Sequence, residues 1–149
     1  LITCFRRQTQ IMARYKMNDL LRLSDRQCSC GSALRVVDEV VGRMDDCFRL
    51  AGPSGPVLVT PDILRNAVLR ADQGITDFRV LQHAADQIEV VLPPDLADDS
   101  AAAAAEALDA AVKACGASVE VTLRRATLPV DFSRKLRRVE CCLLRRDTP

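Results

Sequence analysis

The chain has 149 residues and a formal net charge of +1, and 48% of its residues are hydrophobic while only 3% are aromatic. A nearly neutral chain gives no general reason to expect nucleic acid or a membrane surface as partner. No apolar run approaches the roughly 20 residues that span a bilayer, and the length suits one domain, or one small domain with a piece of another.

The seven cysteines are irregularly spaced, and no secretory leader stands before them. An odd, irregular set is typical of reduced thiols in a cytoplasmic protein rather than of a disulfide framework. The chain opens on Leu1-Ile2-Thr3-Cys4-Phe5, which resembles the middle of a strand, and an isolated strand cannot satisfy its own edge. We therefore expect a fragment of a longer protein.

The first third of the chain carries the alternating pattern of β-hairpins. Residues 1–5 and 11–15 are short apolar–polar runs joined by a polar stretch, which predicts one hairpin. Residues 20–23 and 34–41 flank a turn-rich segment with Cys28 and Cys30, and they predict a second hairpin.

Beyond these hairpins, Gly and Pro at 52–56 predict a loop or hinge, and the pattern then changes. A short strand at 57–59 precedes a helix with Thr60 as N-cap and Pro61 at its first position. Further strands are predicted at residues 75–82, 87–92, 119–123 and 136–144.

A second, alanine-rich helix is predicted to start at a cap formed by Asp98 or Ser100, and to run to about Cys115, with Gly116 ending it. The order strand–helix–strand–strand–helix–strand is typical of a ferredoxin-like arrangement. The sequence therefore predicts an α+β fold, with N-terminal β-hairpins before a small ferredoxin-like domain that has a mixed or antiparallel sheet and two main helices.

Two polar positions could serve a nucleotide. Asp19 follows an aromatic-basic strand, and its two carboxylate oxygens could accept hydrogen bonds from both ribose hydroxyls; the alternative is a turn or cap aspartate. Arg43 offers a planar fork for phosphate or carboxylate; the alternative partner is a nearby acid. Asp45 and Asp46 follow a glycine, which fits either a backbone pivot or a pair of carboxylates.

Basic residues gather towards the end of the chain, where they could meet phosphate or form a solvated face. They are Arg124, Arg125, Arg134, Lys135, Arg137, Arg138, Arg145 and Arg146. Cys28 and Cys30 could be half of a zinc site, but structural zinc generally needs four ligands. A tight hairpin tip without metal is the preferred interpretation, and no metal site is predicted.

Four short motifs occur in a fixed order. They are Tyr15-Lys16-Met17-Asn18-Asp19, Cys28-Ser29-Cys30-Gly31, Gly42-Arg43-Met44-Asp45-Asp46 with Gly52 ten positions after its first glycine, and Arg134-Lys135-Leu136-Arg137-Arg138-Val139. With these motifs, residues 1–139 resemble the C-terminal end of adenylate-forming enzymes, in particular the group of phenylacetate-CoA ligases and coenzyme F390 synthetases.

The resemblance implies a role for each matching residue. Asp19 would hold the ribose hydroxyls of ATP and of the acyl-adenylate, and Arg43 would contact the nucleotide near the ribose and phosphates. Asp45 would be the hinge of a mobile lid. Lys135 would reach the carboxylate and α-phosphate during adenylation, and Gly52 would line a thiol tunnel in the second half-reaction.

The implied activity is ATP-dependent activation of a carboxylic acid, with Mg²⁺, followed by transfer to a thiol such as CoA. Residues 1–43 would be the last strands of a large adenylation domain, and residues 44–149 the lid. The phosphate-binding loop and acyl pocket would lie upstream, so the chain would need the N-terminal adenylation domain of the same protein. Asn18 and Arg134 stand where the family has glycines. Arg134 directly precedes Lys135, so this replacement bears on the adenylation role of that lysine.

Two alternatives remain open. The first is a non-catalytic, ferredoxin-like domain that binds a partner or small ligand through Arg124, Arg125 and the segment around Lys135. The second is a degenerate ligase-like protein with a regulatory role. The acyl substrate and the oligomeric state are not encoded in any recognisable pattern.

Overall fold

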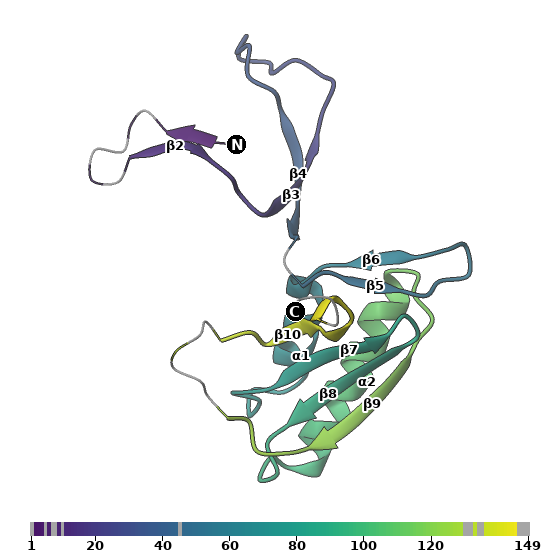
Figure 1. Ribbon diagram of the computed structural model, residues 1–149. Coiled ribbons are helices and arrows are strands. Elements are labelled where there is room, and N and C mark those ends of the chain that lie inside the picture. Colours follow the sequence, from purple (N-terminus) through teal and green to yellow (C-terminus); the bar gives the residue numbers. More distant parts are fainter. Residues whose placement is uncertain are drawn as a thin grey trace. The chain divides into compact units, whose positions relative to one another are not determined.

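The chain divides into two compact units, Leu1–Asp45 and Asp46–Pro149. The computed structural model describes residues 2–4, 6, 9, 11–44, 46–129, 133 and 136–145, and Figure 1 shows their elements. None of the helices in these ranges has the length and apolar character that a membrane span requires.

The first unit consists of two antiparallel hairpins. Strand β1 (Ile2–Cys4) pairs with β2 (Met12–Tyr15), and β3 (Asp19–Leu23) pairs with β4 (Val37–Arg43). Both hairpins predicted from the sequence are confirmed. Every described side chain in this unit whose burial is known is at least partly exposed, so the two hairpins enclose no core of their own.

The second unit is an α+β fold with two helices and a four-stranded mixed sheet. Its elements are β5 (Phe48–Leu50), β6 (Val57–Val59), α1 (Pro61–Ala71), β7 (Arg79–Ala84), β8 (Gln87–Leu92), α2 (Asp98–Ala114), β9 (Glu120–Arg125), β10 (Val139–Cys141) and the 3₁₀ turn η1 (Cys142–Arg145). The sheet order is β10-β7-β8-β9, with β7 and β8 antiparallel and both edge strands parallel to their neighbours. The predicted fold class is confirmed.

The core lies between the sheet and the two helices, which cover one face of it (Figure 1). Leu64 and Val68 of α1 and Leu108 and Val112 of α2 are fully buried, as is Ile88 at the centre of the sheet. Their spacing along each helix is the three-to-four-residue period of a buried stripe.

Strand pairing differs from a simple ferredoxin-like order in two respects. The strand before α1, β6, pairs with β5 instead of joining the four-stranded sheet, and β10 occupies the edge beside β7. The predicted strand at 136–144 is shorter, because η1 begins at Cys142, and the strand predicted from residue 75 begins only at Arg79.

The ends of the helices test the capping predictions. Thr60 and Pro61 begin α1 as expected, although the Thr60 side chain makes no capping hydrogen bond. Neither Asp98 nor Ser100 caps α2: the N-cap is Ala97, and the Asp98 carboxylate instead accepts a hydrogen bond from Arg125 at 2.9 Å.

The end of α2 is as predicted. Gly116 has a φ of +87°, and its N–H donates to Lys113 O at 2.9 Å while the Ala117 N–H donates to Val112 O at 3.0 Å. These paired bonds are the Schellman motif, in which glycine accepts the left-handed conformation at low cost.

Gln82 attaches the β5–β6 hairpin to the sheet. It is fully buried; its Nε2 donates to Arg49 O at 2.7 Å and its Oε1 accepts from the Arg49 N–H at 3.3 Å. Nε2 also donates to Ala84 O, and the Cys141 thiol donates to Oε1. The Gln82 side-chain amide thus makes the hydrogen bonds to Arg49 that the backbone of a neighbouring strand would make. These bonds hold the β5–β6 hairpin, which carries Gly52, against the sheet.

Candidate functional site

Asp19 and Arg43 stand directly opposite each other in the ladder between β3 and β4. The pairing continues past the ladder, because the Met44 N–H donates to Asn18 O at 2.6 Å. The register shifts between Leu20 and Leu21, where an irregularity bends the hairpin just beyond this pair. The two positions predicted to bind a nucleotide therefore meet at one end of a single hairpin.

The environment of Asp19 differs from that of the other acids on its hairpin. The residue is half-buried, and within the described part of the chain it makes no ion pair. Acids farther along the same hairpin are engaged: Glu39 pairs with Arg22 at 2.8 Å and Asp38 with Arg26 at 2.9 Å. A partly shielded carboxylate suits hydroxyl donors, because charge-assisted hydrogen bonds strengthen away from bulk water.

The segment after β4 contains the predicted hinge. Asp45 lies outside the described residues. Asp46, which begins the second unit, has a φ of +56°, in the left-handed region that aspartate enters more readily than most residues. Its Oδ2 accepts a hydrogen bond from Arg137 Nη1 at 2.9 Å, and only 15% of its side chain is exposed.

Lys135 also lies outside the described residues, but the backbone that follows it is held firmly. The Arg138 carbonyl accepts from the Val80 N–H at 2.7 Å, and the Arg138 guanidinium lies over the Phe78 ring, 5.6 Å from its centre. The same guanidinium is 3.5 Å from Asp77. Burial raises the pKa of Asp77, but hydrogen bonds from Arg79 and the Phe78 N–H outweigh it and hold the pKa below its ordinary value.

Gly52 lies in the tight turn between β5 and β6. A Cβ there would meet Val57 Cγ2 at 2.7 Å and the Gly116 carbonyl at 2.8 Å. The Gly52 carbonyl accepts from the Gly55 N–H, and the neighbouring Ala51 carbonyl accepts from the Ser118 N–H at 2.8 Å. Close packing against the end of α2 is thus a structural reason for glycine at this position.

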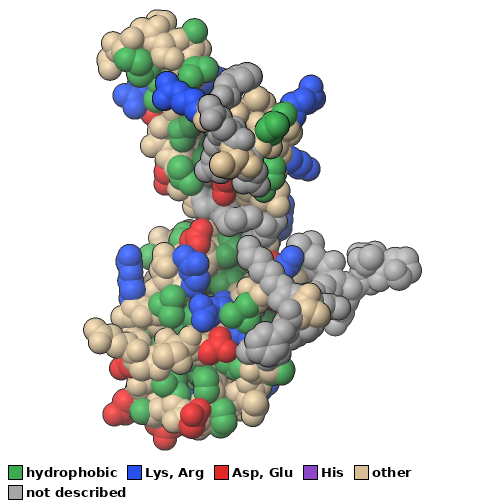
Figure 2. All heavy atoms as spheres, turned by 90° about the vertical axis from the view of Figure 1, so that its left-hand side faces the viewer, with side chains coloured by type: hydrophobic (Ala, Val, Ile, Leu, Met, Phe, Trp, Pro, Cys, Tyr) green, Lys and Arg blue, Asp and Glu red, His purple; other side chains and the backbone are tan. Residues whose placement is uncertain are grey.

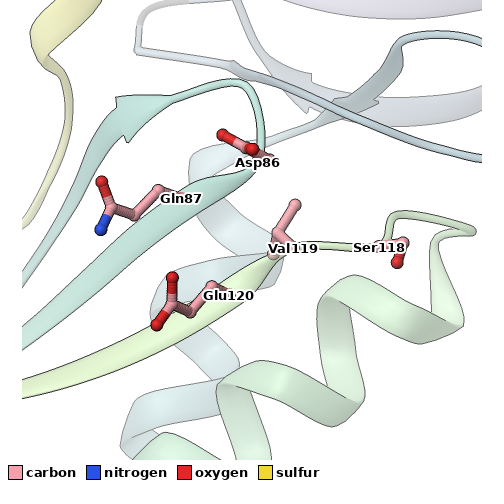
Figure 3. Close-up of a pocket in the computed structure, with 5 residues that line it drawn as sticks. All are labelled: Asp86, Gln87, Ser118, Val119 and Glu120. Carbon is pink, nitrogen blue, oxygen red and sulfur yellow. The ribbon is translucent and has the colours of Figure 1, made fainter.

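An open hollow of about 430 Å³ lies where β8 and β9 begin (Figure 3). Asp86, Gln87 and Glu120 line it, together with Ser118 and Val119, and the Glu120 N–H donates to Asp86 O at 2.8 Å. No basic side chain lines the hollow among the described residues, and two carboxylates do, so it is unsuited to a phosphate. No pattern in the sequence had indicated it.

Four of the basic residues towards the C-terminal end have described side chains, and each of the four is paired with an acid. Arg124 binds Glu89 through two hydrogen bonds of 2.8 and 3.1 Å, Arg125 pairs with Asp98, Arg137 with Asp46, and Arg138 with Asp77. Figure 2 shows basic and acidic side chains interspersed on the face that it draws. These four arginines do not form a free anion-binding surface.

No protein-family model and no curated protein matches the chain. Among solved structures, the chain is similar to an open conformation of 2-hydroxyisobutyryl-CoA ligase in complex with 2-HIB-AMP and CoA. The sequence identity is 19% and the TM-score 0.46. The match covers 82% of this chain and 27% of the ligase, so the chain spans about a quarter of that protein's length.

Proposed function

We propose that this chain is the C-terminal part of an ATP-dependent, acyl-adenylate-forming ligase, within the phenylacetate-CoA ligase-like group. The observation that carries the proposal is the placement of Asp19 opposite Arg43 on paired strands. These two residues come from separate motifs, 24 positions apart, and the family resemblance of each motif points to the same nucleotide. The boundary between the two units falls within the Gly-Arg-Met-Asp-Asp motif, between Asp45 and Asp46, which supports the assignment of that motif to a linker.

The proposed chemistry separates two half-reactions. Asp19 accepts hydrogen bonds from the ribose hydroxyls, and Arg43 lies near the ribose and phosphates. Lys135 neutralises charge at the α-phosphate as the carboxylate attacks and pyrophosphate leaves. Rotation about Asp45 then turns a different face of the lid towards the active site. This rotation brings Gly52 to the path of an entering thiol such as CoA. Closure of the lid excludes water in both steps.

Mg²⁺ would accompany the phosphates of ATP and share their charge. Within the described residues no group of three or more histidine, cysteine or acidic side chains could hold a metal ion. We therefore assign the magnesium ligands, like the phosphate-binding loop and the acyl pocket, to the adenylation domain that would precede Leu1.

The first unit supports the assignment of its strands to a larger domain. Its hairpins expose many large apolar side chains: Ile11, Tyr15, Leu21, Leu23, Leu34, Val37, Val40, Val41 and Met44. A two-stranded hairpin in water is marginal unless another element covers its apolar side. An N-terminal adenylation domain would supply that cover, and Asp19 would then lie at the edge of its nucleotide site.

The experiment uses the longer protein that ends in this chain. Carboxylate-dependent exchange of pyrophosphate into ATP measures the first half-reaction, with a panel of carboxylic acids because the acyl group is not encoded here. Lys135→Ala should slow exchange by several orders of magnitude and affect thioester formation from preformed adenylate much less. Lys113→Ala is the matched control, because Lys113 lies on α2 and pairs with Asp109.

Asp19→Ala should raise the KM for ATP, because a hydrogen bond to a charged group contributes roughly 1.5–3 kcal/mol. Asp19→Asn, which keeps one acceptor oxygen, should fall between Asp19→Ala and the native protein. An ATP requirement unchanged in Asp19→Ala would remove this residue from the site. Unchanged exchange in Lys135→Ala would show that another cation does the work assigned to Lys135. A coding sequence with a start codon directly before Leu1 would contradict the proposal itself.

A further inference from the structure

The tip of the β3–β4 hairpin holds two thiols close together. The Gly31 N–H donates to Cys28 O at 3.0 Å, which closes a tight turn, and Gly31 adopts a φ of +78°. Within this turn the sulfur atoms of Cys28 and Cys30 are 3.0 Å apart. Cys28 is half-buried and Cys30 is exposed. The turn therefore presents one thiol to solvent with a second directly behind it.

Cys30 is the member of the pair that a reagent in solution can reach. A hydrogen bond from the Cys28 thiol, together with one from the Ser32 N–H, lowers the pKa of Cys30 below its ordinary value. The thiolate is the reactive form of cysteine, and exposure gives a reagent access to it. Within the described part of the chain, no third side chain joins the pair to make a group that could hold a metal ion.

We propose that Cys28 and Cys30 are a reversible dithiol–disulfide pair, with low-molecular-weight disulfides of the glutathione type as their reaction partners. The sulfur atoms need to approach from 3.0 Å to the roughly 2.05 Å of a covalent bond. Such a shift is about the size that rotation of an exposed cysteine side chain provides. The pair is separate from Asp19 and Arg43, which lie at the other end of the same hairpin.

The reaction proceeds through two exchanges. The Cys30 thiolate attacks one sulfur of the small disulfide, forms a mixed disulfide and releases one thiolate. Cys28 loses its proton to solvent and attacks the Cys30 sulfur, which forms the Cys28–Cys30 bond and releases the second thiolate. Two electrons pass from the cysteine pair to the small disulfide, and excess small thiol reverses both steps.

The test follows the oxidation state of defined peptides. The whole chain is equilibrated with oxidised glutathione, acid-quenched, blocked with N-ethylmaleimide and cleaved with trypsin. Peptide 27–35 contains only Cys28 and Cys30, and peptide 139–145 contains only Cys141 and Cys142. Because Cys141 is buried and hydrogen-bonded to Gln82, the second peptide is an internal control from the same digest.

We expect peptide 27–35 to lose both free thiols as an internal disulfide, while peptide 139–145 forms none. Reduced glutathione should restore both thiols. A stable glutathione adduct at Cys30 without an internal disulfide would overturn the proposal, and so would equal oxidation of the two peptides. Stoichiometric zinc binding that blocks alkylation of Cys28 and Cys30 would overturn it in favour of a metal site.

Two variants separate the roles of the thiols. Cys28→Ser keeps a hydrogen-bond donor beside Cys30, and Cys28→Ala removes it. Both should stop at the mixed disulfide. Alkylation of Cys30 at neutral pH should be slower in Cys28→Ala than in Cys28→Ser, because the alanine variant lacks the hydrogen bond that favours the Cys30 thiolate. The difference should be only roughly threefold, because a thiolate of higher pKa is also intrinsically more reactive. Equal rates would show that Cys28 does not activate Cys30. Circular dichroism checks that each variant keeps the native fold.

Discussion

Asp46 and Arg137, which are 91 positions apart in the sequence, form an ion pair with 2.9 Å between Asp46 Oδ2 and Arg137 Nη1. Asp46 is the first residue of the second unit, and Arg137 lies two positions after Lys135. The carboxylate is largely shielded, with 15% of the side chain exposed. The start of the second unit is therefore joined by an ion pair to Arg137, which follows the proposed adenylation lysine in the sequence.

The first prediction concerns the energy of this pair. Asp46→Asn removes the charge but keeps a residue that tolerates a φ of +56°, and Arg137→Gln removes the other charge. Each variant should lose about 1 kcal/mol of unfolding free energy, and the double variant should lose little more than either. Urea denaturation followed by circular dichroism measures the three values. Arg22→Gln, which breaks a more exposed pair in the first unit, should change stability less. Additive losses would mean that the pair contributes nothing as a pair.

The second prediction concerns Gln82. Gln82→Leu fills a similar volume but leaves the N–H and carbonyl of Arg49 without their partners, which should cost about 2–3 kcal/mol of unfolding free energy. Gln87→Leu on the neighbouring strand is the control, because Gln87 is partly exposed, and it should lose less than about 0.5 kcal/mol. A comparable loss in the two variants would contradict the role of Gln82 in attaching the β5–β6 hairpin. Hydrogen exchange at Arg49 gives a local readout and should quicken in Gln82→Leu.

The third prediction concerns the turn that contains Gly52. Gly52→Ala places a methyl group within 3 Å of Val57 Cγ2 and the Gly116 carbonyl, so we expect a loss of about 1–3 kcal/mol. Ser54→Ala in the same exposed turn should be neutral. The double variant Gly52→Ala, Val57→Ala removes the clash with Val57 but keeps the clash with the Gly116 carbonyl. The remaining clash should be visible as an altered NMR amide shift. If Gly52→Ala is as stable as the native chain, the close approach is not the reason for glycine there, and a role in a thiol path gains weight.

Local patterns in the sequence predicted the individual elements well. Short apolar–polar runs predicted the first N-terminal hairpin, and two runs flanking a turn-rich tip predicted the second. Pro61 and Gly116 marked the start of one helix and the end of the other. These signals are local, since each depends on backbone preferences within one turn or strand. The helix start at Ala97 was missed, because Asp98 forms an ion pair with Arg125, a residue that no local pattern connects to it.

Contacts between distant segments were not predictable in the same way. The attachment of the β5–β6 hairpin to the sheet involves Gln82, which in the sequence is simply a polar residue in a strand, and β5 itself has only three residues. The exact opposition of Asp19 and Arg43 depends on two register shifts along their hairpin, and a shift of one residue would move a side chain to the other face. The roles of Asp45 and Lys135 remain predictions from the motifs.

The last prediction is a pH dependence at Glu89. The hydrogen bonds from Arg124, supported by His83 and opposed by burial, hold the pKa of Glu89 below its ordinary value of 4.5. A carboxyl with a lower pKa in the folded state contributes stability above its unfolded pKa and loses it as the pH falls through the folded pKa. In a His83→Gln background, which removes the imidazole, Glu89→Gln should therefore lose about 1 kcal/mol near neutral pH. The difference should shrink as the pH falls below 4.5.

Urea denaturation between pH 7 and pH 3 measures the unfolding free energies of the His83→Gln chain and of the His83→Gln, Glu89→Gln chain. Arg124→Gln in the same background should flatten the pH dependence, because the guanidinium that favours the charged carboxylate is gone. A difference between the two chains that stayed constant over this range would show that Glu89 titrates alike in the folded and unfolded states. The Arg124–Glu89 pair would then be a solvated contact between β8 and β9 that adds nothing appreciable to the free energy of unfolding. Its carboxylate would gain nothing from folding.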